Sequence, residues 1–600
     1  MAGFTTPLLS EYDYKLARSC LTKLYYRKHN YPTNNSFTAY DRCLTDGVFM
    51  IYALAQVYLQ PLLAVECGSS LELGTQLTLD LLQAPQVTLW EPVLVAGGKA
   101  ARPFVLRKSH QVYELIYVAT KGGKVLRHPK SQKIQSEWLS PLLSLAFQQL
   151  ILAELVPAGQ IKCSLLLPDR DFVAQGDNYH WGFRLYRQPR GEVLSRFSGV
   201  RLDIAAGHRI PLQKFFTLVD VTAEVAEVRT EIQPEVNRLL HLLAEGLPKP
   251  IVPLDKHCKD CEFKVEGVGG KDGFRECWGE LAQTKHHIFD FYHGTRLHNG
   301  SKTIVRHLVE QGQASMFAVP LEALAENFHG QRQRIQLHYT AHNQEWLSPD
   351  ILPILASFTY PLRFIDFETA RLALPPCRGL SPYTIVAFQW SCHTIPAPGA
   401  PPQHQSWLSL EKDFPNWEFA RTLKEYLGDG GTVLTWGMHE YTVLKEIANQ
   451  MERTNHPDRC TRDWLIHLPP LVDLHALTLK YYFHPRMGGR TSLKRVFPAI
   501  WQTNPYLHSL SWLQEYVKDT IANPYAQLDR YQLLDREVVI QEGMEAALAY
   551  HEFHYGSAKG NPLWGKLLEQ YCRLDTMAMV VVWWHWSYLS RQLSIPPVGK

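Results

Sequence analysis

Two acidic residues, Asp366 and Glu368, stand near the end of a mostly apolar stretch at residues 361–369. Successive side chains of a β-strand point to opposite faces, so an Asp-x-Glu pair places both carboxylates on one face. Two carboxylates about 4 Å apart repel by about 1 kcal/mol in water and by about 4 kcal/mol at an intermediate dielectric. A bound divalent cation would remove this penalty. The simpler alternative is a surface strand with two solvated acids, and further acids downstream decide between the two.

Three later residues are candidates to join this pair. A short β-branched strand at residues 432–436 precedes a helix predicted over 441–451, so Glu440 lies in or beside the first helical turn. The helix dipole alone would explain a single acid there. Tyr571 and Asp575 are four residues apart and share one face of a helix. Because a buried aspartate on an apolar helix is costly without a partner, Asp575 also indicates a cation.

Three residues between these motifs are weaker candidates. Asp473 is either a further metal ligand or the N-cap of a helix, and the cap is the simpler interpretation. Ser492 and Lys494 lie in a loop-to-helix stretch, where a helix N-terminus is suited to binding a phosphate.

Four cysteines form a second candidate site. Cys258 and Cys261 make a C-x-x-C pair, Cys277 follows in the same region, and Cys20 lies near the N-terminus. Thiolates are suitable ligands for zinc or for an iron–sulfur cluster. A redox pair together with ordinary half-buried cysteines is the alternative.

The pattern around these motifs predicts three regions. A capping box at residues 10–13 begins a helix predicted over 10–28, and strand-like runs and a helix around 139–155 follow. We expect residues 1–285 and 346–600 to form two domains, with 286–345 as a helical connector.

Composition restricts the class of protein. A chain of 600 residues with 46% hydrophobic residues can bury several cores. Its net charge of +3 means that contacts with nucleic acid must come from local patches. Eleven cysteines, an odd number, argue against a disulfide framework. No signal sequence opens the chain and the apolar run at 577–584 is too short to span a bilayer, so we expect a cytoplasmic protein without membrane contact.

In chain order, Asp366-x-Glu368, Glu440 and Tyr571-x-x-x-Asp575 resemble motifs one to three of the DnaQ-like, or DEDD, exonucleases. The resemblance implies a ribonuclease H-like fold in which the four acids bind two Mg²⁺ or Mn²⁺ ions. Tyr571 would mark the DEDDy subclass, where the tyrosine orients the attacking water. Motif two commonly carries Asp, so Glu440 is a departure from the family, and Asp473 is its substitute.

The four cysteines, one near the start and three near the end of the first region, resemble the iron–sulfur subclass of RecB-like nucleases. In that class four cysteines hold a [4Fe–4S] cluster that clasps the two ends of a PD-(D/E)XK domain. The split between the two ends of the region favours such a cluster over zinc.

The same resemblance contains a second departure. The positions of the family's catalytic Asp, Glu and Lys hold Phe104, Tyr117 and Ala119. None of these side chains binds a cation or activates water, so we expect an inactive nuclease centre. The alternative is that Glu114 or Lys121 substitutes by position. Gln148 resembles a residue of the family's closing helix and would be a relic or a packing residue.

Both halves together look like a bacterial family of RecB-like and DnaQ-like fusions, with an α/β fold in each half. The resemblance implies a metal-dependent 3′–5′ exonuclease that hydrolyses single-stranded or end-exposed nucleic acid, DNA rather than RNA, by a two-metal reaction. The N-terminal domain would bind nucleic acid or act as a scaffold. The alternative is a non-catalytic binding or assembly component of a phage-defence or mobile-element system, with protein partners from that system.

Overall fold

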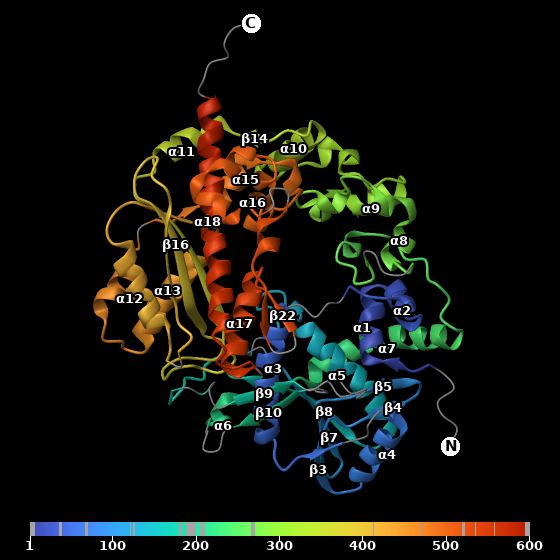
Figure 1. Ribbon diagram of the computed structural model, residues 1–600. Helices are drawn as coiled ribbons and strands as arrows, with labels where there is room; N and C mark the ends of the chain where they lie inside the picture. Colours follow the sequence, from blue (N-terminus) through green and yellow to red (C-terminus); the bar gives the residue numbers. More distant parts are fainter. Residues whose placement is uncertain are drawn as a thin grey trace.

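The computed structural model contains two mixed α/β regions, each built around one β-sheet, and a largely helical segment between them (Figure 1). In Figure 1 the N-terminal region runs from blue to green, and the C-terminal region from yellow to red. The structure describes residues 7–34, 39–65, 70–120, 122–123, 126–177, 179, 183–187, 200–204, 210–265, 270–411, 413–468, 470–518, 522–533, 536–556 and 558–593.

The N-terminal region is organised by a six-stranded sheet of order β11-β8-β7-β6-β3-β2. Its strands are β2 (Leu63–Ala64), β3 (Gln86–Trp90), β6 (Val105–Ser109), β7 (Val112–Val118), β8 (Gln160–Pro168) and β11 (Phe216–Asp220). β3, β6 and β7 form an antiparallel meander. The chain then crosses through α5 (Ser136–Leu155) into β8, which runs parallel to β7.

Helix α5 is the main apolar helix of this region. Among the described residues, α5 is the one helix that is long and apolar enough to cross a membrane. From the sequence, only the shorter apolar run at 577–584 was considered for this role. Leu145, Phe147 and Ile151 are completely buried against the sheet. Its apolar character is therefore explained by its place in the core.

Further elements surround this sheet. They are α1 (Glu11–Ser19), α2 (Leu21–Lys28), α3 (Ala39–Tyr58), α4 (Leu71–Leu81), α6 (Leu212–Phe215), α7 (Thr222–Ala244), β1 (Leu9–Ser10), β4 (Leu94–Ala96), β5 (Lys99–Ala101), β9 (Phe183–Arg187) and β10 (Val200–Ile204). The predicted capping box is present, because Ser10 and Asp13 exchange hydrogen bonds. The single helix predicted over 10–28 is wrong in one respect: it is broken at Cys20, whose backbone is extended. One extended residue leaves the apolar spacing on either side intact, so the pattern did not reveal the break.

The segment between the two regions has a small core of its own. It contains α8 (Gly273–Trp278), α9 (Ile304–Glu310) and α10 (Phe328–Ala341), with short 3₁₀ turns between them. This core includes both Phe274 and Leu308, so it extends across the expected boundary at residue 285. From α10, the buried Arg332 donates hydrogen bonds to the backbone carbonyls of Thr478 and Tyr482, which attaches this helix to the C-terminal region.

The C-terminal region contains a five-stranded sheet of order β17-β16-β15-β18-β19. Its strands are β15 (Leu362–Arg371), β16 (Ile385–Ile395), β17 (Gln403–Leu408), β18 (Thr432–Thr435) and β19 (Val472–Asp473). β16 is antiparallel to β15 and to β17, whereas β15, β18 and β19 are parallel. The strand that carries the Asp-x-Glu pair is therefore central.

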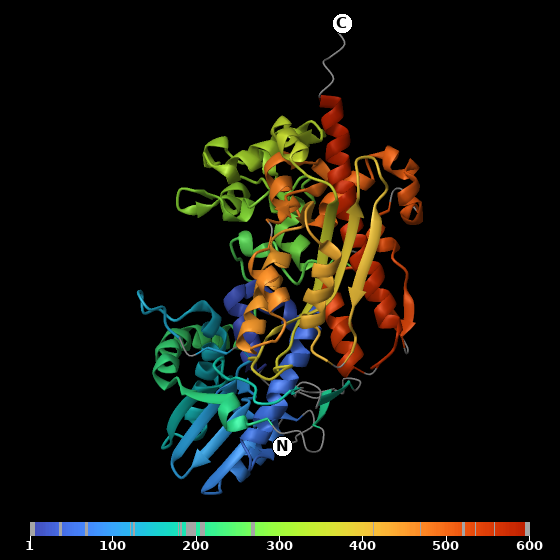
Figure 2. The ribbon, with the colours of Figure 1, turned by 90° about the vertical axis from the view of Figure 1, so that its left-hand side faces the viewer.

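Helices cover both faces of this sheet, as Figures 1 and 2 show. One face packs against α12 (Asn416–Leu427), α13 (His439–Arg453) and α14 (Arg459–Ile466), and the other against α16 (Leu493–Trp501), α17 (Gly543–Tyr555) and α18 (Leu563–Leu593). Along β15 the side chains alternate as predicted: Ile365 and Phe367 belong to the first core and Phe364 to the second. Asp366 and Glu368 therefore face α18. Smaller elements complete the region: α11 (Leu352–Ala356), α15 (Leu474–Tyr481), β14 (Trp346–Leu347), β20 (Tyr482–Phe483), β21 (Tyr531–Leu533) and β22 (Arg536–Val538).

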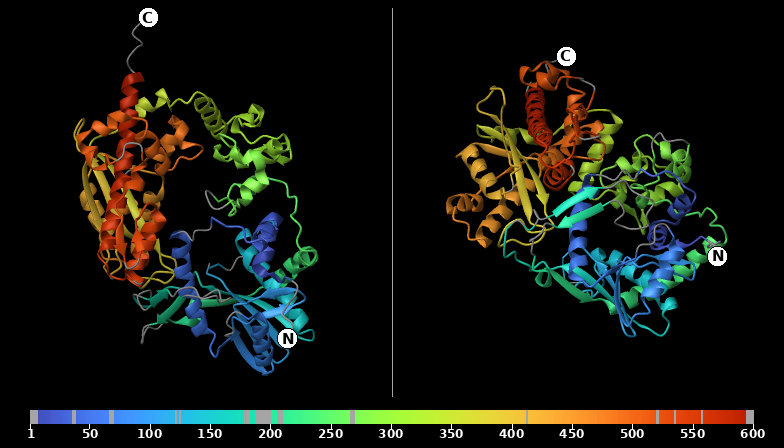
Figure 3. Two further views of the ribbon diagram at one scale, coloured as in Figure 1. Left: turned by 45° about the vertical axis from the view of Figure 1, so that its right-hand side comes forward. Right: turned by 60° about the horizontal axis from the view of Figure 1, so that its bottom comes forward.

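The loop that follows β15 joins the two regions. Ala373 and Leu374 are buried in the core on one face of the N-terminal sheet. The backbones of Ala174, Gly379 and Leu380 are linked by hydrogen bonds of 2.9 and 3.0 Å. Helix α17 also lies beside α3 (Figure 3). The strand with the two acids thus continues directly into the contact with the N-terminal region.

Candidate metal centre

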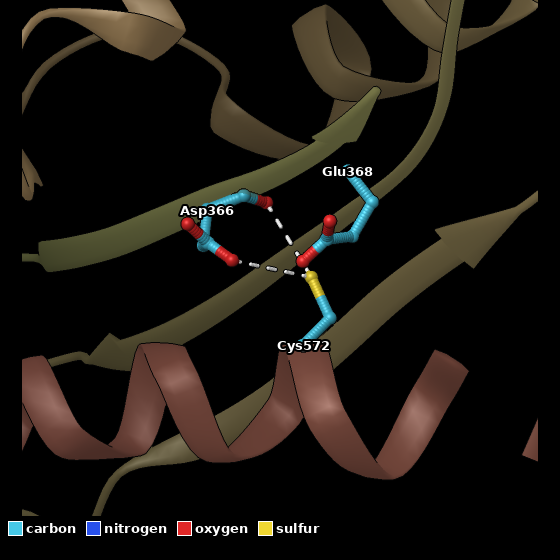
Figure 4. Close-up of side chains that lie close together, drawn as sticks. All are labelled: Asp366, Glu368 and Cys572. Carbon is cyan, nitrogen blue, oxygen red and sulfur yellow. Dashed lines mark hydrogen bonds between the residues drawn. The ribbon is translucent and has the colours of Figure 1, made fainter. Parts of the chain in front are cut away.

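Asp366 and Glu368 converge with a thiol from α18 (Figure 4). One carboxylate oxygen of each acid and the Sγ of Cys572 all lie within 4.8 Å of one another. Glu368 and Cys572 are buried, and Asp366 is partly buried. The pairing of β15 with β16 shifts in register immediately after Glu368. The local alternation of the strand thus brings the two acids together, and α18 closes the site.

Glu440 reaches this cluster from the first turn of α13. Its side chain is 2% exposed, and its Oε2 has no hydrogen-bond partner. After burial itself, the carboxylate of Asp366 is the strongest influence that raises the pKa of Glu440. An unpaired carboxylate oxygen in the interior is costly, so this position demands a proton or a cation.

Asp575 and Tyr571 approach from α18, one helical turn apart. The hydroxyl of Tyr525 donates a hydrogen bond of 2.5 Å to Asp575 Oδ1, and Lys494 Nζ lies 3.8 Å from Asp575 Oδ2. Lys494 also donates a hydrogen bond to the hydroxyl of Tyr571. Tyr571 and Asp575 therefore share one face of α18, as predicted. Lys494, one of the three weaker candidates, contacts both of them.

The electrostatics of the site favour added positive charge. Burial raises the pKa of Asp366, Glu368 and Glu440, and repulsion within the cluster raises it further. After burial, the charge of Asp575 contributes most to the raised pKa of Asp366. The charge of Asp366 contributes most, after burial, to the raised pKa of Glu368 and of Glu440. Lys494 acts in the opposite direction on Asp366 and Glu368 without reversing the shift. Burial and mutual repulsion thus both oppose ionisation of these carboxylates, and a bound cation would relieve the repulsion.

Two further residues were predicted as weaker candidates, and the structure gives them other positions. Asp473 accepts hydrogen bonds from the backbone N–H groups of Ala476 (3.1 Å) and Gly437 (2.9 Å), so it caps α15. Ser492 is exposed at the N-cap of α16 and makes no side-chain capping bond. Of the two rival acids, Glu440 is therefore the one that interacts with both Asp366 and Glu368 among the leading influences on their pKa or its own.

Two contacts of the site escaped the sequence analysis. Cys572 lies one residue after Tyr571 and three before Asp575, a spacing that places it on the same side of a helix. The sequence alone could therefore have identified Cys572 as a neighbour of Asp575. Tyr525 lies fifty positions from Asp575 in a 3₁₀ turn, and nothing in its neighbourhood indicates the contact.

The four predicted cysteine ligands lie in one neighbourhood, where the N-terminal region meets the segment that follows it. Cys20 is at the junction of α1 and α2, whereas the others lie near or within α8. Burial acts to raise the pKa of Cys20, but hydrogen bonds from His257 and from nearby backbone outweigh it and lower the pKa. His257 Nε2 also lies 3.6 Å from Cys258 Sγ, and the hydroxyl of Tyr26 lies 3.1 Å from Cys277 Sγ. At Cys261 and Cys277, by contrast, burial prevails and raises the pKa of the thiol, to about 11 for Cys261.

The spacing of these thiols bears on the choice between zinc and a cluster. Sulfur atoms around one tetrahedral zinc ion are about 3.8 Å apart, since each Zn–S bond is about 2.3 Å. Among the described residues, no three of the four sulfur atoms lie within 4.8 Å of one another. As they stand, the four thiols are therefore not arranged around a single tetrahedral ion.

Phe104 and Tyr117, two of the residues that the RecB-like resemblance aligned with catalytic positions, belong to an aromatic cluster. The rings of Phe104 and Tyr117 are 4.9 Å apart in an edge-to-face arrangement, and Tyr52 lies 4.9 Å from Phe104. Ala119 is buried in the core beside them. Phe104, Tyr117 and Ala119 therefore pack in the interior of the N-terminal region.

The substitutes considered for that centre are otherwise occupied. Glu114 accepts a hydrogen bond of 2.7 Å from Ser164 and pairs with Arg107 at 3.3 Å. Gln148 is buried and donates a hydrogen bond of 2.8 Å to the carboxylate of Glu11, so it has a packing role. Lys121 lies outside the described residues.

Comparison with known sequences found a family match within the C-terminal region. Residues 363–492 match the family described as "Domain of unknown function (DUF2779)". The match contains Asp366, Glu368 and Glu440 and ends before α18, so Tyr571 and Asp575 lie outside it. No curated protein and no solved structure matched the chain.

Proposed function

We propose that this protein is a metal-dependent 3′–5′ exonuclease with a DEDDy-type centre in its C-terminal region. The observation that carries this proposal is electrostatic: Asp366 and Glu368 of β15 interact with Glu440 of α13 and Asp575 of α18, and the Oε2 of Glu440 is buried without a hydrogen-bond partner. The strand order supports a ribonuclease H-like fold, because the second strand in the chain is antiparallel to a central first strand and the fourth and fifth are parallel to it.

The donor set fits hard divalent cations. Carboxylate oxygens are preferred ligands of Mg²⁺ and Mn²⁺, and Asp366, Glu368, Glu440 and Asp575 would hold two such ions. When bound, two ions supply an activated water and stabilise the leaving 3′ oxygen of the strand. The excess of buried carboxylates over cationic side chains is the electrostatic reason for binding them.

Tyr571 and Lys494 would organise the reacting groups. Lys494 donates to the oxygen of the Tyr571 hydroxyl, so the tyrosine's own proton points away from Lys494 and can be donated to a water or a phosphate oxygen. Tyr525 donates a hydrogen bond to one carboxylate oxygen of Asp575, and the other oxygen faces Lys494. These contacts hold the Tyr571–Asp575 face of α18 toward β15.

The N-terminal region would be an inactive RecB-like domain that binds or positions the strand. Its β3-β6-β7 meander, crossover helix α5 and parallel strand β8 support a PD-(D/E)XK-type fold. Cys20, Cys258, Cys261 and Cys277 would hold a [4Fe–4S] cluster, with zinc as the alternative. The substrate would be single-stranded or end-exposed nucleic acid, DNA rather than RNA, in the cytoplasm and in the context of phage defence.

The test is nucleotide release by the purified full chain. A DNA strand labelled at its 5′ end is incubated with Mg²⁺ or Mn²⁺, and a ladder that shortens from the 3′ end is expected. Asp366→Asn should abolish the ladder, whereas Asp429→Asn, an exposed carboxylate in the same region, should not. Equal release by Asp366→Asn contradicts the proposal. Binding without cleavage under either metal supports the non-catalytic alternative, and an RNA strand in parallel decides the substrate.

A further inference from the structure

We infer that Cys572 gives the candidate centre a third type of ligand, so that Asp366, Glu368 and Cys572 together bind a thiophilic divalent ion such as Zn²⁺ or Cd²⁺. The binding follows from the geometry of these three residues. Its consequence, that such an ion displaces Mg²⁺ or Mn²⁺ and inhibits the enzyme, rests on the proposed exonuclease function.

The first support is the position of the thiol. Cys572 is completely buried, and its Sγ lies 3.5 Å from Asp366 Oδ2 and 3.8 Å from the Asp366 carbonyl oxygen. In Figure 4 the sulfur points between the side chains of Asp366 and Glu368, away from the axis of α18. The thiol is therefore directed into the carboxylate pair and not into the apolar core.

The second support is a comparison of distances. A tetrahedral zinc ion holds an oxygen at about 2.1 Å and a sulfur at about 2.3 Å, which puts the two ligand atoms about 3.6 Å apart. The observed separation of Asp366 Oδ2 and Cys572 Sγ is 3.5 Å. All three ligand atoms already lie within 4.8 Å, so binding requires only small side-chain rotations.

The third support is the unsatisfied acid beside this triad. Glu440 Oε2 is buried without a hydrogen-bond partner and interacts electrostatically with Asp366. Glu440 is not one of the three ligand residues, and it adds a negative charge beside them that favours a bound cation. Three protein ligands plus one open position are typical of zinc sites that still admit a water or another ligand.

The chemistry separates the two classes of ion. Mg²⁺ takes oxygen ligands and gains little from sulfur, whereas Zn²⁺ and Cd²⁺ bind thiolate strongly. On binding, the Cys572 S–H bond breaks, the proton leaves to solvent, and a metal–sulfur bond forms. The same carboxylates then hold an ion that also has a bond to α18, so the soft ion competes with the hard ones for one place.

The experiment is a Cd²⁺ titration of the full chain, read by the ultraviolet sulfur-to-cadmium charge-transfer band. The four cysteines of the N-terminal region contribute the same background to every variant. Cys572→Ser is expected to lose one Cd²⁺–thiolate equivalent. Cys392→Ser, which changes another buried cysteine on β16, should retain the full band.

A second variant keeps the inference testable if Cys572→Ser does not fold. The double substitution Asp366→Asn and Glu368→Gln leaves the thiol intact and should weaken Cd²⁺ binding at this site at least tenfold. An unchanged band in Cys572→Ser, or unchanged affinity in the double variant, overturns the inference. A Cys572-dependent band in a protein without nuclease activity would uphold the ion site and reject the exonuclease. Nuclease activity without a Cys572-dependent band would uphold the exonuclease and reject the ion site.

Discussion

Lys494 donates a hydrogen bond to the hydroxyl of Tyr571, although the two residues are separated by 77 positions in the chain. The ammonium group also lies 4.5 Å from the centre of the tyrosine ring and 3.8 Å from Asp575 Oδ2. One cation from α16 thus fixes a hydroxyl and a carboxylate of α18. Both groups belong to the candidate centre, so the orientation of that helix face depends on Lys494.

Replacing Lys494 tests this dependence. Lys494→Met keeps the aliphatic length and removes the charge, so the Tyr571 hydroxyl loses its donor. We expect kcat to fall by about 10²-fold, the size seen when one preorganised donor is removed from a reacting centre. The neighbouring Arg495→Ala, an exposed residue of the same helix, should change kcat less than twofold. Equal losses in both variants would point to a general electrostatic effect of the basic stretch.

Glu440 and Asp473 compete for the role of motif-two ligand, and their substitutions should differ. Glu440→Gln removes the repulsion between Glu440 and Asp366, so we expect the unfolding midpoint of the metal-free protein to rise. Nuclease activity should fall by at least about 10³-fold, because a metal ligand is lost. Asp473→Ala removes a helix cap and should cost about 1 kcal/mol of stability. Thermal unfolding and nucleotide release measure the two effects. The opposite pattern would assign the ligand role to Asp473.

Stability of the metal-free protein should depend on pH through this cluster. Burial and then Asp575 raise the pKa of Asp366 to about 8, compared with about 3.9 for an unfolded aspartate. Between these values the folded protein binds more protons than the unfolded chain, so the free energy of unfolding falls as pH rises from about 4 to about 8. The slope is at most about 1.4 kcal/mol per pH unit for one group.

Two comparisons check that pH effect. Asp366→Asn should flatten the fall between pH 5 and 8, and Asp429→Asn should retain it. Saturating Mn²⁺ should reverse the trend, because the ion replaces protons and binds better as they leave. A protein whose unfolding midpoint stays level across this range without metal would contradict the buried acidic cluster.

If the four cysteines hold a [4Fe–4S] cluster, the purified protein should be coloured. Anaerobic purification should give a brown preparation with about four iron and four sulfide per chain. Cys277→Ser should lower both contents and destabilise the region, because Cys277 lies at the end of the domain opposite to Cys20 in sequence. Cys460→Ser, an exposed cysteine elsewhere, serves as the control. Stoichiometric zinc without iron would support the alternative metal.

The N-terminal sheet should not contribute to cleavage. Glu114→Gln is expected to leave nucleotide release unchanged and to lower stability by about 1–2 kcal/mol, because Ser164 and Arg107 lose a charged partner. Activity that survives Asp366→Asn and disappears with Glu114→Gln would locate the nuclease in this sheet instead.

Local patterns of the sequence were sufficient for features that depend on neighbouring residues. The shared face of Asp366 and Glu368 follows from strand alternation, and that of Tyr571 and Asp575 from helical spacing. The capping box at Ser10 is local as well. The break at Cys20 was not predicted, because apolar spacing is insensitive to a single extended residue.

Contacts between distant segments were decided by the tertiary structure alone. The sequence by itself supplied the acids and their faces, but it left Glu440 and Asp473 as rivals and gave no reason to join Lys494 or Tyr525 to α18. Folding of the central sheet between two helical layers brings β15, α13 and α18 to one point, and burial there makes each carboxylate depend on its neighbours. Such a site depends on which helix face packs on which strand, and that is a property of the whole core.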